Sequence, residues 1–409
     1  MDEVVSPLKI RNFKLFISAR ICFIFAMQMV IFSIAWYIYE LTHDKLSIGL
    51  LGLSEILPAI VLSLYAGHII DKSDKRTMLL RTMGLYCVTA ILLGFLCTAK
   101  ARTMLPVVGI QAAIYGVYFC TGVLRSFTGP TMSSIVAQLV PRLALPKAIT
   151  YSTTAWQAAA VSGPIVAGLL IAHIGIAVSF SIAAILILIA VWLIFRIPAL
   201  SPANTNKNEK AWASVREGLA YVMNTKELLA AMSVDMFAVF FGGAVAMLPV
   251  YAKDILHISA AGMGWLRAAQ SIGTVCALTA LSRHPLKRQQ GRIMLQCVAM
   301  FGLCILVFAV SKNFWLSFSV LFLSGIFDAI SMLVRSTILQ MYVPDNMRGR
   351  VSSVSSMFVN SSNELGEFES GVAARVLGTV PSVLFGGCMT LLVVGVAWFK
   401  SPKLRKLEY

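Results

Sequence analysis

Charged residues are scarce in this chain of 409 residues. Asp, Glu, Lys and Arg together make up 13% of it, whereas hydrophobic residues make up 58%. A soluble domain cannot bury so large an apolar share, because the buried fraction of the surface rises only slowly with chain size. The composition therefore excludes an ordinary soluble protein and indicates that a lipid bilayer surrounds most of the chain.

The sequence also lacks the patterns of a metal centre, a disulfide framework or an enzyme. Its eight cysteines lie inside or at the ends of apolar runs without a CxxC pair, and its five histidines are scattered. The cysteines are therefore interpreted as small packing residues. HExxH, GxSxG and the Walker glycine loop are absent from the sequence. We expect no metal, no cofactor, no enzymatic activity and no ATP-driven pumping by this chain alone.

Long hydrophobic runs are the dominant feature that is present. A transmembrane helix needs roughly 20 apolar residues, and about twelve runs qualify: 14–41, 47–70, 76–98, 103–127, 147–173, 176–196, 228–252, 260–283, 290–311, 313–338, 350–377 and 380–399. The first run lacks a small-residue cleavage site, which favours a retained span over a signal peptide. The predicted fold class is an all-α membrane protein with about twelve transmembrane helices.

The positive charges fall mainly on one predicted side of the membrane. The net charge is +16, from 34 basic and 18 acidic residues. With both termini in the cytoplasm, 24 basic residues lie on the inner side, six on the outer side and four within spans. This asymmetry is typical of a bacterial inner (plasma) membrane protein, and it favours contact with anionic lipids over nucleic acid binding.

One hydrophilic stretch divides the runs six and six. Residues 197–227 begin with a Pro- and Ser-containing, Asn/Lys-rich segment and continue with apolar residues at helical spacing. This pattern predicts a flexible linker followed by an amphipathic helix on the cytoplasmic face. We therefore expect an N-terminal six-helix half over 1–196, the linker over 197–227, and a C-terminal six-helix half over 228–409.

The segment GHIIDKSDKR, residues 67–76, lies between two apolar runs. It resembles the G-x-x-x-D-[RK]-x-G-[RK]-[RK] loop between the second and third helices of major facilitator superfamily (MFS) transporters. The residues that fit are Gly67, Asp71, Lys72, Lys75 and Arg76, whereas Asp74 replaces a frequent glycine. The resemblance implies two pseudo-symmetric six-helix halves that rock about a site at mid-membrane. It also implies that Asp71 locks one state by pairing across the halves; the alternative is that Asp71 anchors the loop. The basic cluster is expected to face water.

Two further segments strengthen this resemblance. The run SGPIVAG, residues 162–168, is similar to the antiporter signature G-P-x-x-G-G of MFS exporters, through Gly163, Pro164 and Gly168. A Gly-Pro pair is expected to open a groove and bend the helix. The run VPDNMRGRV, residues 343–351, is similar to the MFS branch that contains the enterobactin exporter and macrolide-efflux proteins.

Charged residues inside the predicted spans are the candidate substrate or proton-coupling groups. Each costs roughly 2.5–3.5 kcal/mol at mid-bilayer on insertion scales, so it needs a partner, water or a function. The candidates are Glu55, Asp235, Asp328, Glu364, Glu367 and Glu369, with Arg20, Arg125, Arg267 and Arg335 as possible partners. Arg125 and Arg335 lie near span ends, where snorkelling or pairing with the loop aspartate is favoured.

The span over 350–377 carries the densest acidic set. Glu364 and Glu367 are three residues apart and share a helix face, while Glu369 turns away from them. Repulsion between two carboxylates on one face makes one of them bind a proton more readily. The alternative is that Arg20, Arg267 or Arg375 neutralises them structurally. The arginine that many proton-driven MFS exporters carry deep in the fourth span is missing here, which leaves the usual coupling arrangement in doubt.

These observations predict a secondary active transporter that exports a small organic molecule, such as a siderophore-like compound or a drug. The expected partners are that substrate, membrane lipids and protons as coupling ion, and we expect a monomer. The alternative functions are import or lipid flipping by the same fold, or a sensor that uses a transporter fold.

Overall fold

A computed structural model describes residues 6–199, 211–284, 289–344 and 347–405. Within these ranges the chain forms helices and turns and contains no strand. Long apolar runs form helices here because in a bilayer every backbone polar group must be paired within its own segment. The Asn/Lys-rich segment 200–210 of the predicted linker lies outside the described residues.

The chain divides into two compact units. Unit 1 contains residues 1–42 and 54–208, and unit 2 contains residues 43–53 and 209–409. The helices of unit 1 are α1 (Arg11–Thr42), α2 (Lys45–Lys72, from residue 54 on), α3 (Lys75–Leu96), α4 (Ala99–Met104), α5 (Val107–Leu139), α6 (Leu145–His173) and α7 (Ile176–Phe195). Those of unit 2 are the first part of α2, α8 (Ala211–Asn224), α9 (Lys226–Phe241), α10 (Leu248–Val250), α11 (Ala260–Arg283), α12 (Gln290–Val310), α13 (Phe314–Tyr342), α14 (Arg348–Leu377), α15 (Thr379–Lys400) and α16 (Pro402–Arg405).

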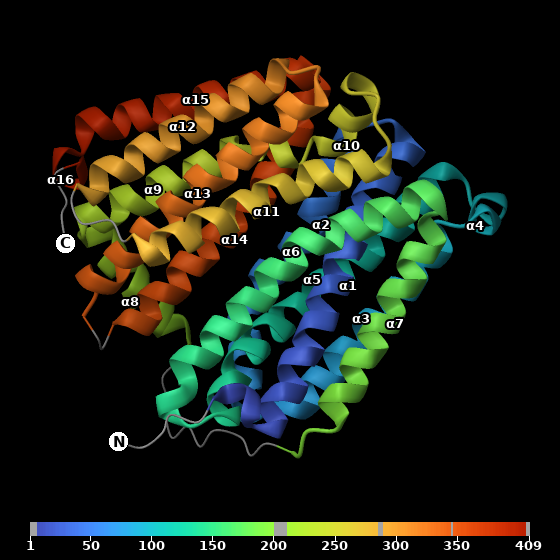
Figure 1. Ribbon diagram of the computed structural model, residues 1–409, viewed down its shortest axis with the longest axis horizontal. Coiled ribbons are helices and arrows are strands. Elements are labelled where there is room, and N and C mark those ends of the chain that lie inside the picture. The colour runs from blue at the N-terminus through green and yellow to red at the C-terminus, as the bar shows by residue number, and fades with distance from the viewer. Residues whose placement is uncertain (1–5, 200–210, 285–288, 345–346, 406–409) are drawn as a thin grey trace. The chain divides into compact units, whose positions relative to one another are not determined.

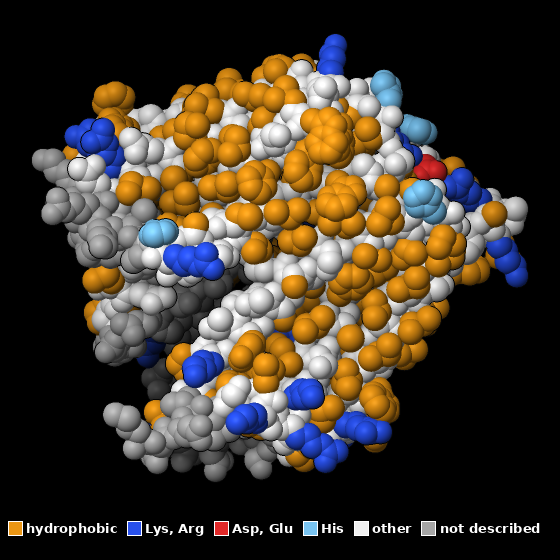
Figure 2. All heavy atoms as spheres, viewed as in Figure 1, with side chains coloured by type: hydrophobic (Ala, Val, Ile, Leu, Met, Phe, Trp, Pro, Cys, Tyr) orange, Lys and Arg blue, Asp and Glu red, His pale blue; other side chains and the backbone are white. Residues whose placement is uncertain are grey.

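Ten helical segments of the described chain are long and apolar enough to cross a membrane. The two remaining predicted spans are α11 and α14, which are 24 and 30 residues long but more polar. The predicted count of about twelve is therefore consistent with the structure. On the face shown in Figure 2, apolar side chains cover the helices, and most Lys and Arg side chains lie near helix ends, as expected where the helix middles face lipid.

The seventh predicted span is not one continuous helix. α9 ends at Phe241, and a 3-10 turn, the short α10 and a π-helical turn over Tyr251–Ile255 complete the segment. A side chain at Gly242 would meet the Ala238 carbonyl oxygen at 2.6 Å. Such interruptions are tolerated in a membrane where neighbouring helices pack around the broken turn.

In unit 1, α1 packs against α6 and α7, and α3 packs between α5 and α7 (Figure 1). In unit 2, α13 packs against α11 and α12, while α9 contacts α14 and α15. Glycines permit the closest approach in unit 2, because a Cβ atom at Gly325 would overlap the Gln270 carbonyl oxygen and one at Gly273 would overlap that of Phe322. This packing fixes α13 beside the elements that form the site described next.

Candidate functional site

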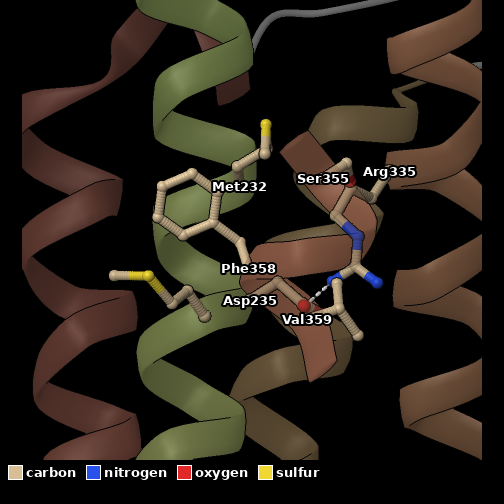
Figure 3. A pocket seen from close by; sticks show the side chains of 7 residues that line it. Met232, Asp235, Arg335, Ser355, Phe358 and Val359 are labelled. Carbon is tan, nitrogen blue, oxygen red and sulfur yellow. Dashed lines mark ion pairs between the residues drawn. The ribbon is translucent and has the colours of Figure 1, made fainter. Parts of the chain in front are cut away.

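An ion pair joins two helices inside unit 2. Arg335 of α13 contacts the carboxylate of Asp235 of α9 through its terminal nitrogen, as the dashed line in Figure 3 shows. The two side chains are only 9% and 8% exposed. Burial removes both charges from water, so each side chain depends on the other for compensation. The prediction that Arg335 snorkels or pairs with the loop aspartate is therefore wrong.

Two cavities border this ion pair, and Asp235 lines both of them. The first is a small space between α9, α13 and α14 and is drawn in Figure 3. The second is a small space between α9, α12 and α13. Its lining consists of Asp235, Ala238, Val239, Val298, Phe301, Asp328 and Ser331. The second cavity thus brings Asp235 and Asp328 to one space, although they lie on different helices.

Asp328 is partly buried and has no hydrogen-bond or ion-pair partner among the described residues. It is the fifteenth of the 29 residues of α13, which places it at the middle of that helix. Asp328, Ser331 and Arg335 follow one another at helical spacing and share one face of α13. A carboxyl group at this depth without a partner must carry a proton or rely on water in the cavity.

Arg267, a basic residue of the neighbouring helix α11, lies at the same level as Asp328. Gly273 lies against Phe322 and Gln270 lies against Gly325, so α11 and α13 run antiparallel. Continuing this register by one turn places Arg267 beside Asp328. Arg267 is partly buried and forms no ion pair with Asp328 or with another described residue.

A second ion pair lies in unit 1, and its arginine is more exposed than its acid. Arg125 of α5 contacts Glu55 of α2 at 3.2 Å, with the two side chains 40% and 13% exposed. A Cβ atom at Gly122 would overlap the Glu55 carbonyl oxygen, so α2 and α5 touch one turn before this pair. Arg125 is thus the partner of a membrane acid, a role that sequence analysis had named as possible but had ranked below snorkelling or pairing with the loop aspartate. Arg20 of α1 has a buried Nε without a hydrogen-bond partner among the described residues.

The three acids of α14 differ in how far their side chains are buried. Glu364 is 8% exposed, whereas Glu367 and Glu369 are partly buried. A Cβ atom at Gly52 would lie 3.1 Å from Oε2 of Glu367, so this carboxylate packs against the first part of α2 within unit 2. Both Glu364 and Glu367 interact with further residues. Arg375 pairs with Asp44 at 3.7 Å and does not neutralise these glutamates.

The loop motif is partly described. Gly67, Asp71 and Lys72 belong to α2, which continues to Lys72, but their side chains lie outside the described residues. Lys75 is only 6% exposed, so its side chain packs within the protein. The side of the membrane that the basic cluster faces stays a prediction. Arg76 donates a hydrogen bond to the Phe195 carbonyl oxygen at 2.7 Å and stacks on its ring.

The Gly-Pro segment lies in an unbroken stretch of α6. Gly163, Pro164 and Gly168 are buried, and α6 continues through them from Leu145 to His173. A Cβ atom at Gly163 would lie 2.6 Å from Cβ of Gln28, so this glycine permits the close approach of α1 and α6. The expected groove and bend at this segment stay predictions.

Comparison with known proteins then decides the family. The family model described as "Transmembrane secretion effector" matches residues 3–409. The chain belongs to this family. Its relatives include the staphyloferrin A transporter of Staphylococcus aureus (22% identical, covering 91% of this chain and 92% of the relative) and the multidrug efflux pump Tap of Mycolicibacterium fortuitum (22%, covering 93% of each). The enterobactin exporter EntS of Shigella boydii is 24% identical and covers 92% of this chain and 88% of its own.

Solved structures show the same fold at lower identity. A POT family transporter bound to a thioalcohol-conjugated peptide has a TM-score of 0.76 at 12% identity and covers 97% of both chains. The nucleoside transporter NupG has a TM-score of 0.72 at 14% identity and covers 96% of this chain and 100% of its own. The resemblance to MFS transporters, and to the branch of the enterobactin exporter, is confirmed. This member of the secretion effector family is a multi-pass membrane protein with the MFS fold.

Among the described residues, no group of three or more His, Cys, Asp or Glu side chains could hold a metal ion. The charged site of unit 2 consists of the Asp235–Arg335 ion pair and the neighbouring Asp328. Sequence analysis identified both aspartates and named Arg335 among the possible partners, but it favoured snorkelling or pairing with the loop aspartate over the pair with Asp235. The signal was present: Asp235 lies nine residues after the start of α9, and Arg335 lies seven before the end of the neighbouring α13, which predicts similar depths for antiparallel helices.

Proposed function

We propose that this protein is a secondary active transporter that exports a small organic molecule by alternating access. The match of the secretion effector family over residues 3–409 is the observation that carries this proposal. The names of the relatives support a siderophore-like compound or a drug as the cargo. Transport, and not a covalent reaction, is the proposed activity.

The proposed setting is the bacterial inner membrane, with both termini in the cytoplasm. The excess of Lys and Arg on the predicted inner loops supports this orientation. The proposed sites are the charged groups within the spans: Glu55 in unit 1, and Asp235, Asp328, Glu364, Glu367 and Glu369 in unit 2, together with Arg20 and Arg267. These residues supply the polar contacts that a cargo or a coupling ion needs in an apolar environment.

The experiment that tests the proposal compares cells with and without the gene, grown with and without iron, by mass spectrometry of the medium and of cell extracts. Export of a siderophore predicts that an iron-chelating metabolite disappears from the medium of the deletion strain and accumulates inside the cells. Reintroducing the wild-type gene restores secretion, and an empty vector does not.

If the metabolites in the medium are the same with and without the gene, the next experiment is a drug-susceptibility panel on the same strains. Export of drugs predicts lower inhibitory concentrations in the deletion strain for the transported class of compounds. If neither secretion nor susceptibility changes, while uptake of a nutrient falls in the deletion strain, export is refuted in favour of import.

A further inference from the structure

The second cavity of unit 2 contains a carboxyl group, that of Asp328, which forms no ion pair with a described residue. Asp235 and Asp328 both line this cavity, but only Asp235 has a cationic partner, Arg335. The pair keeps Asp235 ionised, because protonating it would leave the arginine buried and uncompensated. Asp328 is therefore the acid of this cavity that is free to change its protonation state.

The charged groups on the surrounding helices agree with this assignment. Helix α9 presents Asp235, which is neutralised, and α12 presents Val298 and Phe301, which are apolar. Helix α11 carries Arg267 at the level of Asp328, and the two side chains do not form an ion pair. The acids of α14, Glu364, Glu367 and Glu369, do not line the cavity.

The cavity also provides a polar path along α13. Ser331 lies one turn from Asp328 and one turn from Arg335, and it lines the same cavity. A hydroxyl group both donates and accepts hydrogen bonds, so it can relay a proton or hold a water molecule between the two charged positions. The polar groups therefore extend from the middle of α13 toward the Arg335 end.

We propose that Asp328 binds and releases the coupling proton of transport, while the Asp235–Arg335 pair holds the adjacent acid ionised. This inference rests on the proposed transport function and assigns its coupling site to α13, not to the acids of α14. A neutral Asp328 removes the cost of a bare charge at mid-membrane, and its deprotonation restores that charge. The charge on Asp328 thus changes the free energy of the helix packing around it. A proton that binds one conformation of the transporter more tightly than the other shifts the equilibrium toward that conformation.

The first test measures protonation of Asp328 without any transported compound. The full-length protein in lipid vesicles is treated with dicyclohexylcarbodiimide at a series of pH values, and modified peptides are mapped by mass spectrometry. A protonated carboxyl group adds to the carbodiimide: its proton passes to a nitrogen, its oxygen bonds to the central carbon, and an acyl shift leaves a stable adduct. We expect an adduct on Asp328 that is lost as the pH rises, and none on Asp235.

Absence of the adduct on Asp328 at every pH would overturn the proposal, as would an adduct whose yield does not depend on pH. This result is obtained on the wild-type protein, so it does not depend on whether a variant folds. It is also separate from the proposed export function, because a labelled Asp328 in a protein that exports nothing would refute export alone.

The second test uses the compound found in the comparison of media. In vesicles with a pH gradient, Asp328→Asn should abolish gradient-driven accumulation and retain exchange of labelled for unlabelled compound, while Asp328→Glu keeps both. Asp254→Asn is the matched control, because it removes an exposed acid of unit 2 that is not among the proposed sites, and it should leave accumulation unchanged. Retention of gradient-driven accumulation in Asp328→Asn would refute the assignment.

Discussion

Asp235 of α9 and Arg335 of α13 form an ion pair in which each side chain is less than a tenth exposed. The pair between Glu55 and Arg125 in unit 1 is different, since its arginine is 40% exposed. Exposed charges interact weakly because solvent screens them, whereas a buried charge that loses its partner is strongly destabilising. The two pairs should therefore respond differently to loss of one partner.

Replacing Asp235 with Asn should lower the stability of the folded protein substantially. The change leaves Arg335 buried without a counter-charge, which costs about 3–5 kcal/mol in comparable buried pairs. Thermal unfolding of the purified protein in detergent measures the effect as a lower melting temperature. The double variant Asp235→Leu with Arg335→Met should recover most of the loss, because apolar side chains of similar size need no compensation. A double variant as unstable as the single one would contradict this account.

Replacing Glu55 with Gln should have a smaller effect. Arg125 is already 40% exposed and is not left fully buried when its partner is lost, so we expect a smaller loss of stability than in Asp235→Asn. The same unfolding measurement, made in parallel with Asp235→Asn, provides the comparison. Equal losses of stability in the two variants would show that exposure does not distinguish the pairs.

The contact of α11 with α13 depends on the lack of a side chain at Gly325. A Cβ atom there would overlap the Gln270 carbonyl oxygen, and backbone cannot move aside as a flexible side chain can. Gly325→Ala should therefore destabilise the protein by about 1–3 kcal/mol, as overpacked interiors do. Thermal unfolding and the yield of monodisperse protein report the change.

Gly395 of α15 is the matched control for this substitution. It is also a helical glycine of unit 2, but no atom lies within 4 Å of the position a Cβ would take. Gly395→Ala should be neutral or stabilising by up to about 1 kcal/mol, because alanine is the better helix former. If both alanine variants behave alike, helix propensity and not packing decides the outcome at Gly325.

Hydropathy predicted the helices of this protein well, because the bilayer imposes both their length and their internal hydrogen bonding. Even α11 and α14, which are more polar, match the runs 260–283 and 350–377 closely. The break after Phe241 was missed, because apolar residues continue through it and only the packing of neighbours shows where the helix stops.

The candidate site was less predictable than the fold. The scarcity of membrane charges singled out Asp235 and Asp328, since each such group needs a reason to be there. Pairing requires knowledge of which helices are neighbours and at what depth, and hydropathy contains neither. Arg335 was therefore interpreted as a snorkelling residue, although α9 and α13 bring it against Asp235.

Asp74, which stands where the MFS loop often has glycine, begins α3. Its carboxylate accepts hydrogen bonds from the backbone N–H groups of Arg76 and Thr77, both at 3.2 Å, and from the Thr77 hydroxyl at 2.5 Å. An N-cap side chain satisfies backbone donors that the first helical turn leaves unpaired. Glycine is also tolerated at this position of a helix, so the departure from the motif preserves the start of α3.

This role predicts a graded response at Asp74. Replacement by Ala should cost about 1 kcal/mol, replacement by Gly only a few tenths, and replacement by Asn close to nothing, because Asn retains the accepting oxygen. Amide hydrogen exchange at Thr77 and Met78, measured by mass spectrometry on the protein in detergent, should accelerate in Asp74→Ala and stay near the wild-type rate in Asp74→Asn. Equal acceleration in both variants would mean that the negative charge of Asp74, and not its hydrogen bonding to the first turn, stabilises the start of the helix.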